Sequence, residues 1–416
     1  MTNGNATRSS RGQRTICVPI SEERYLRIIN DPQEFRRTLD ELFRQMPELF
    51  PANFAEGYQL KDDRRSAKQG VPIRRIVLKD GLAYSVRPSF LLPYMTARTE
   101  DVQGPLFLRK FGVPFWALAY VFGRDSMFWY RMECGLGRFS VVGTTVRRAA
   151  LPEDLLADEH HQTLDGKKVY IATTVAAGCV MGAEPATTAG TDDLKDAYAV
   201  FKREARDVTP EYVPKTVNTD GWKGTKAAWK ILFEHVVILQ CFLHAWLKIR
   251  DRAKHLKVQF PEISRRVWEA YHAPDRRSFG QRIRSLRTWA RVHLNGVVLE
   301  KVLDLCKKRD RWSIAYHHPK GHRTSNMLDR LMRGMNRYFD HGQHFHGSHE
   351  ACRLHSRAWA LLWNFAPWHR ATARKNQGWR CPAERLNQHR YHECWLQNLL
   401  ISASLGGYRR SFPQNP

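Results

Sequence analysis

Three aspartates stand where they could share metal ions. Asp158 falls in a segment with strand character, Asp220 ends a second such segment, and Asp329 lies later in a segment with helical spacing. Mg²⁺ prefers carboxylate oxygens as ligands, and two such ions about 4 Å apart serve in-line attack on a phosphodiester. Aspartates at these three positions could therefore act as catalytic groups that hold two Mg²⁺ ions, with Mn²⁺ as a possible substitute.

Two other acids compete for these positions. Glu159 is adjacent to Asp158, and successive side chains of a strand point to opposite faces, so only one of the two can point at Asp220. Glu350, in the segment H-G-S-H-E-A-C, is a rival for the third position because it lies one predicted helix after Asp329.

The elements that must position the first two aspartates follow a regular order. Composition and turn signals predict strands over 154–164, 168–176 and 179–187. A helix that starts at Thr191, a strand over 212–219, a helix over 225–233 and a strand over 236–239 follow. This β-β-β-α-β-α-β order resembles an RNase H-like core, in which the first strand and the end of the fourth lie side by side at the sheet centre.

Three motifs resemble one enzyme family. The segment N-T-D-G-W (218–222), followed by Cys241-Phe242-Leu243-His244, is similar to the second acid and the Cys-x-x-His signature of Mutator-like DDE transposases of prokaryotic insertion sequences. The segment T-S-N-M-L-D-R (324–330) resembles the T-x-N-x-x-E-R helix that carries the third acid, which favours Asp329 over Glu350. The resemblance covers about residues 150–370 and departs from the family at Asp329, where Glu is usual.

The resemblance implies an activity and further site residues. It implies a transposase that binds the terminal repeats of a mobile element and catalyses two-metal DNA cleavage and strand transfer, as a homodimer or larger assembly on double-stranded DNA. Cys241 and His244 would position the substrate strand, and Asn326 would orient the carboxylate of Asp329 from the same helix face. Residues 245–322 would be the all-helical insertion that separates the last strand from the third-acid helix.

The N-terminal part carries different signals. Residues 1–14 read as a disordered basic leader, and residues 15–105 as an α+β module with helical spacing over 21–50 and a hairpin over 74–87. Within 106–150, two short helices around Gly123 predict a helix-turn-helix-like DNA-binding region. The remaining boundaries predicted are a catalytic core over 151–244 and 323–370 and a basic C-terminal tail over 371–416.

The charge of the chain points to a polyanionic partner. The 416 residues contain 67 Lys and Arg against 41 Asp and Glu, a formal net charge of +26. Residues 248–416 hold 33 of these basic residues and 12 of the acids, so most of the excess lies after the last predicted strand. Nucleic acid is the first candidate for such a partner. The arginines predicted to contact DNA are Arg124, Arg131, Arg138, Arg250, Arg252, Arg330 and Arg333.

Composition also bears on compartment and on alternative functions. Eight dispersed cysteines without a Cys-x-x-Cys pair, and the absence of an apolar leader, predict a cytoplasmic, nucleoid-associated protein without a membrane span. A catalytically decayed transposase that still binds DNA remains an alternative because of Asp329. A helix-turn-helix transcriptional regulator is the other, although three converging carboxylates would have no role in it.

Overall fold

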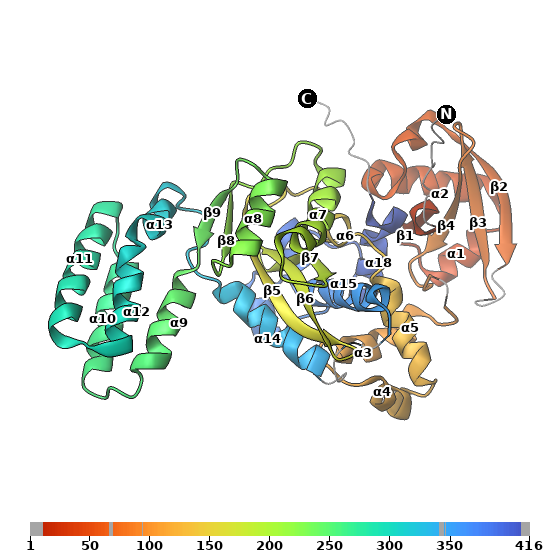
Figure 1. Cartoon of the computed structure of the whole chain (residues 1–416). Helices are drawn as coiled ribbons and strands as arrows, with labels where there is room; N and C mark the ends of the chain where they lie inside the picture. Colours follow the sequence, from red (N-terminus) through yellow and green to blue (C-terminus); the bar gives the residue numbers. More distant parts are fainter. Residues whose placement is uncertain (1–10, 66–69, 94, 341–344, 346, 409–416) are drawn as a thin grey trace, which may run out of the picture.

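The computed structural model describes residues 11–65, 70–93, 95–340, 345 and 347–408 (Figure 1). These residues form a mixed α/β structure with two mixed sheets. One sheet lies in the N-terminal part and the other in the middle of the chain. A group of helices extends from the second sheet on the side away from the first (Figure 1).

The central sheet has five strands in the order β7-β6-β5-β8-β9. They are β5 (Asp154–Leu164), β6 (Lys167–Ala176), β7 (Cys179–Ala186), β8 (Thr216–Thr219) and β9 (Val237–Gln240). Strands β5, β6 and β7 are antiparallel neighbours, whereas β8 runs parallel to both β5 and β9. With α7 (Thr191–Val208) before β8 and α8 (Lys223–Leu232) after it, the predicted order of elements is confirmed.

Each face of the central sheet is covered by a different pair of helices. Leu155 and Ala157 of β5 belong to a hydrophobic core formed with α7 and α8. Leu156, the residue between them, belongs to a second core formed with α14 (Asn326–Asp340) and α15 (His349–Phe365). The alternation along β5 therefore decides which side chains face which helices.

The N-terminal sheet has four strands in the order β1-β4-β3-β2. The predicted hairpin is confirmed as β3 (Pro72–Leu78) and β4 (Ala83–Pro88), joined at Gly81, whose φ is 76°. Strands β1 (Thr15–Val18) and β2 (Tyr58–Arg65) were not predicted. Helices α1 (Glu22–Ile28) and α2 (Pro32–Gln45) account for the helical spacing that begins at residue 21.

The C-terminal segment corrects the predicted basic tail over 371–416. It forms α16 (Arg370–Lys375), α17 (Pro382–Asn387) and α18 (Trp395–Ser402), and α18 is buried in the same core as the N-terminal sheet. The Ser404 hydroxyl accepts a hydrogen bond from the backbone amide of Cys17 in β1. The described part of this segment thus completes the N-terminal core, and Figure 1 shows α18 beside β1.

Four helices connect the two sheets. They are α3 (Thr99–Arg109), α4 (Phe115–Phe122), α5 (Ser126–Leu136) and α6 (Val141–Thr145). The predicted pair of helices around Gly123 is present as α4 and α5, with Asp125 capping α5 through the amide of Phe128. The predicted disordered leader lies mostly outside the described residues, but Arg11–Arg14 form a 3-10 helix, so that prediction is wrong for these four residues.

Helices follow β9 over the range 245–322, where the sequence predicts helical structure. They include α9 (Phe242–Ala253), α10 (Gln259–Tyr271), α11 (Arg276–His293), α12 (Gly296–Lys307) and α13 (Arg309–Ser313). These helices share their own hydrophobic core, which includes Phe242 and Trp246. Among the described residues, none of the helices is both long and apolar enough to cross a membrane.

Candidate active site

Asp158 on β5 and Asp220, the residue directly after β8, lie at equivalent heights of two neighbouring parallel strands. In the register of β5 and β8, Leu156 is opposite Asn218. Asp158 is two residues beyond Leu156, and Asp220 is two residues beyond Asn218. The parallel pairing therefore brings these two aspartates side by side where β8 ends.

The turn after β8 fixes the backbone around Asp220. Gly221 has a φ of 101°, a conformation that favours glycine. A Cβ atom at Gly221 would come within 2.6 Å of the Gln240 side-chain amide. The backbone amide of Trp222 donates a hydrogen bond of 2.7 Å to Oδ1 of Asp220, which leaves the other carboxylate oxygen for a ligand.

Asp158 and Glu159 are separated by the sheet. Glu159 is buried on the side of α7 and α8, where it accepts hydrogen bonds from Tyr198 (2.7 Å) and Thr225 (2.9 Å). His160, two residues after Asp158, contacts Asn336 of α14 on the opposite face. Because residues two apart in a strand point to the same face, Asp158 lies on the face of His160, toward α14.

Asp329 is held in the first turn of α14 by Ser325. The Ser325 hydroxyl donates a hydrogen bond of 3.0 Å to Oδ2 of Asp329. The Cys241 thiol in turn lies 3.2 Å from the Ser325 hydroxyl, and the Ser325 amide donates to the Cys241 sulfur. Ser325 therefore joins the start of α14 to the start of α9, a role that the sequence motif did not assign to it.

His244 interacts with Cys241 and with two of the aspartates. The Cys241 sulfur raises the pKa of His244 to about 9, burial opposes the rise, and the negative charges of Asp158 and Asp329 contribute to it. An imidazolium is therefore favoured among these acids. Cys241, Asp158 and Asp329 thus all act on the charge of His244.

The pKa of Asp158 shows that the carboxylates repel one another. Burial raises it to about 7, and the charges of Asp220 and Glu159 add to the rise. A bound cation would relieve this repulsion, and carboxylate oxygens are the donors that Mg²⁺ prefers. In the described ranges, however, no three His, Cys, Asp or Glu side chains are close enough together to hold a metal ion. The donor types fit Mg²⁺, but the three carboxylates would have to move closer to bind it.

Two other predicted candidates lie in different settings. Glu350, the rival third acid, forms a salt bridge of 2.7 Å with Arg353 at the start of α15. The charges that act on Glu350 come from Arg353, Arg357 and His349 rather than from the aspartates. Asn326 is exposed as the first residue of α14, where Ser325 rather than Asn326 contacts Asp329.

The arginines predicted to contact DNA are spread over the surface. All seven side chains, Arg124, Arg131, Arg138, Arg250, Arg252, Arg330 and Arg333, are exposed. Arg250 forms a salt bridge of 2.9 Å with Asp251, and Arg124 lies over the ring of Phe128. Arg330 and Arg333 belong to the same helix as Asp329 and are therefore closest in the chain to the carboxylates.

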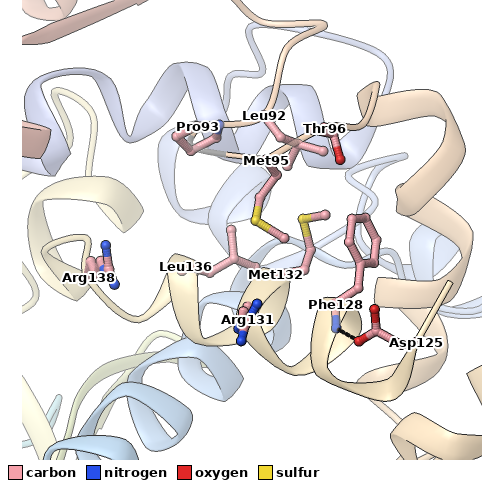
Figure 2. Close-up of a pocket in the computed structure, with 11 residues that line it drawn as sticks. Leu92, Pro93, Met95, Thr96, Asp125, Phe128, Arg131, Met132, Leu136 and Arg138 are labelled. Atoms are coloured by element: carbon pink, nitrogen blue, oxygen red, sulfur yellow. Dashed lines mark hydrogen bonds between the residues drawn. The ribbon is translucent and has the colours of Figure 1, made fainter. Parts of the chain in front are cut away.

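Two of these arginines border a pocket in the N-terminal half. The pocket has a volume of about 360 Å³ and lies between α5 and the segment around Met95. Figure 2 shows the side chains of Met95, Met132 and Phe128 along its wall. Arg131 and Arg138 also line it, so this cationic, apolar pocket is separate from the aspartate site.

No protein-family model matches the chain, and the search of curated proteins found no match.

Proposed function

We propose that the chain is a DDE-type transposase of the Mutator-like class, which cleaves DNA and transfers the cut strand. The observation that carries the proposal is the placement of Asp158 and Asp220 at equivalent heights on adjacent parallel strands, with Asp329 on a helix that covers the same face. The strand order β7-β6-β5-β8-β9 is also the order of an RNase H-like core, which supports the same conclusion.

Asp158, Asp220 and Asp329 would hold two divalent ions, Mg²⁺ or Mn²⁺. Bound there, the ions would activate the attacking oxygen and neutralise charge on the leaving oxygen. The chain would position Asp329 through Ser325 and would hold a cationic His244 next to the carboxylates. A cation at His244 also favours approach of a DNA phosphate to the three carboxylates.

Double-stranded DNA would be both partner and substrate. The pair α4–α5 around Gly123, with Arg124 and Arg131, is the proposed helix-turn-helix-like contact to the terminal repeats. Transfer of two ends would require at least a homodimer on the DNA, and such a protein would act on the chromosome in the cytoplasm. This part of the proposal rests on the family resemblance and on the exposure of the arginines.

The proposal can be tested with the gene's own flanking DNA. A plasmid that carries the coding sequence and the flanks on both sides is incubated with purified protein and Mg²⁺ or Mn²⁺, and broken ends are mapped at nucleotide resolution. We expect breaks at discrete positions on each flank with the wild type. Asp220→Asn should abolish them while DNA binding persists, because asparagine keeps the acceptor for the Trp222 amide but not the charge.

Matched variants decide between the proposal and its alternatives. Asp196→Asn changes an exposed carboxylate on α7 and should leave cleavage unchanged. Full activity of Asp220→Asn would show that the site is wrongly assigned. If the wild type binds the flanks but cuts neither, and Asp329→Glu does not gain cleavage, the chain is a DNA-binding protein without catalysis.

A further inference from the structure

Helix α11 carries a row of arginines that form no salt bridge with the described residues, although Arg276 contacts the ring of His317 and Arg282 donates to the backbone carbonyl of Glu269. It contains no acidic residue, and its six arginines are all exposed: Arg276, Arg277, Arg282, Arg284, Arg287 and Arg291. Within the described ranges, no carboxylate forms a salt bridge with any of them. Such a concentration of positive charge is unfavourable in isolation and favours an anionic ligand.

The neighbouring helix α10 shows the contrast. Arg265 forms salt bridges with Glu262 and Glu269, at 2.5 Å to the former, and Arg266 pairs with Glu262 at 2.7 Å. These arginines are satisfied within their own helix. Helix α10 therefore supplies carboxylates that pair with its own arginines, whereas α11 supplies none.

Part of the α11 row lines a groove against α13. Arg276, Arg277 and Arg284 of α11 and Arg309 of α13 surround an open space of about 400 Å³. Its acidic lining residue is Asp310, which lies 3.2 Å from Arg309 and is largely exposed. Four guanidinium groups against one carboxylate give the groove a net positive charge that matches phosphate groups, which arginine binds through paired N–H donors.

The row is longer than the groove, which points to a polymer rather than a small anion. Arg277, Arg284 and Arg291 recur every seven residues, so they span about 21 Å along one side of α11. Each strand of duplex DNA places a phosphate about every 3.4 Å along the axis. The row therefore matches the backbone of several consecutive nucleotides.

The groove also connects to the aspartate site through α13. Helix α13 packs against β9, the neighbour of β8, and Figure 1 shows it between α11 and the central sheet. Lys226 of α8 lies on the sheet side of α13. Burial lowers the pKa of Lys226, and the charge of Arg311 of α13 lowers it further, whereas the charge of Asp220 raises it. Lys226 therefore interacts electrostatically with both α13 and the end of β8. Basic side chains thus continue from the groove toward the end of β8.

We propose that the groove between α11 and α13, extended by the arginine row of α11, binds the phosphate backbone of duplex DNA beside the cleavage site. The identification of the polyanion as DNA rests on the proposed function. The charge pattern and the groove rest on the structure alone.

The test measures binding without cleavage. Fluorescence anisotropy of the full chain is recorded in EDTA with a labelled duplex of random sequence, about three helical turns long, between about 50 and 200 mM salt. Arg277→Gln/Arg284→Gln should weaken binding at least about tenfold and reduce the slope of log K against log salt by about two, since each lost phosphate contact lowers it by about 0.9. Arg265→Gln/Arg266→Gln removes the same charge from α10 and should change affinity less than about twofold.

Further measurements separate the possible failures. Arg287→Gln/Arg291→Gln, outside the groove but on the same row, should give an intermediate loss, and thermal melting should show that every variant is folded. Equal losses for the α10 and α11 variants, or no loss for either, would overturn the proposal. So would equal or tighter binding of a duplex RNA or of polyglutamate. Because EDTA prevents metal-dependent cleavage, a groove effect can be found even if the chain cuts no DNA, and cleavage can be found even if the groove has no effect.

Discussion

Asp158 and Glu159 are adjacent in β5 but belong to opposite sides of the central sheet. Glu159 is buried with Tyr198 and Thr225 under α7 and α8, and Asp158 faces the side of α14. Burial raises the pKa of both carboxyl groups, but only Glu159 has two hydroxyl donors to stabilise its charge. The two acids therefore have different roles, one in the site and one in the core.

Isosteric amides should separate these roles. Asp158→Asn should reduce cleavage at least about 100-fold, since a metal ion contributes several kcal/mol and each 1.36 kcal/mol is a factor of ten. Glu159→Gln should instead lower the free energy of unfolding by about 1–3 kcal/mol, because a buried hydrogen-bonded charge loses part of its network. Cleavage of mapped flanks and urea unfolding measure the two effects.

Calorimetric titration with Mn²⁺ provides the control for this comparison. Asp158→Asn should lose metal binding while its unfolding curve stays close to that of the wild type. If Glu159→Gln loses metal binding at full stability, then the face assignment of β5 is wrong.

Ser325 should act as a positioning residue for Asp329. Ser325→Ala removes the 3.0 Å hydrogen bond to Oδ2 and should weaken Mn²⁺ affinity about tenfold, which is the usual cost of removing a partner that orients a metal ligand. Ser325→Thr keeps the hydroxyl and should restore the affinity. A loss that the threonine variant does not rescue would indicate a packing effect at the buried Ser325 and not an orienting bond.

Local patterns predicted the elements of the central sheet and one hairpin of the N-terminal sheet, because each of these elements carries its own signal. The strand β6 is rich in β-branched residues, the hairpin at Gly81 has a turn that requires a positive φ, and α7 has apolar positions spaced by three and four. The register of β5 with β8, which brings Asp158 beside Asp220, depends on contacts between segments about 60 residues apart. Only the resemblance of the element order to an RNase H-like core anticipated it.

Long-range packing accounts for what the sequence did not predict. Strand β1 has four residues and little alternation, and it is fixed by pairing with β4 and by Ser404, almost 400 residues later. The basic residues of the C-terminal segment predicted a tail, but Trp395 and Leu396 and their neighbours are buried against the N-terminal sheet. The hydrogen bond from Ser325 to Asp329 was not predicted either, because a serine next to the start of a helix is most simply a helix cap.

His355 should make stability fall as pH rises. It lies against Glu133 at 3.0 Å. Burial opposes its charge, but Cys134 and Glu133 together raise its pKa from 6.5 to about 9. Because the folded pKa lies above the unfolded value, this contribution is fully present below about pH 6.5 and is lost as pH rises through about 9, with a size of up to about 3 kcal/mol.

The comparison of the wild type with His355→Asn isolates this effect. Asparagine keeps a donor near Glu133 but does not titrate, so the difference in unfolding free energy between the two proteins should shrink from pH 6.5 to pH 9. Lys110, whose pKa burial lowers to about 8, titrates in the same range in both proteins and cancels in the difference. A difference that is constant with pH would contradict the assignment.

The close approach of α6 to the C-terminal turn should make Gly143 intolerant of any side chain. A Cβ atom at Gly143 would lie 1.8 Å from the carbonyl oxygen of Gly407, so one backbone must move. Gly143→Ala should lower the free energy of unfolding by about 1–3 kcal/mol or more. Gly135→Ala is the matched control in α5, where nothing lies within 4 Å, and it should raise stability by up to about 1 kcal/mol. Urea unfolding of both variants tests whether the C-terminal segment is part of the fold.

Arg357 of α15 holds together segments from three parts of the fold. Its buried guanidinium forms salt bridges with Glu184 of β7 and Glu204 of α7 and donates to the carbonyl oxygen of Gly137 at 2.9 Å. Arg357→Met would leave two buried carboxylates without a cation, and loss of one partner of a buried ion pair costs about 3–5 kcal/mol.

A second substitution distinguishes lost charge pairing from lost packing. Glu184→Gln added to Arg357→Met removes one of the two unpaired charges and should recover part of the lost stability. Lower pH should also reduce the cost of Arg357→Met, because protonation of Glu184 removes an unpaired negative charge. Even in the wild type, burial raises the pKa of Glu184 against the effect of Arg357, so its protonation in the variant should begin at a still higher pH. A loss of stability that is independent of pH and is not reduced by Glu184→Gln would show that Arg357 acts through its volume and its bonds to Gly137 and Phe139 rather than through charge.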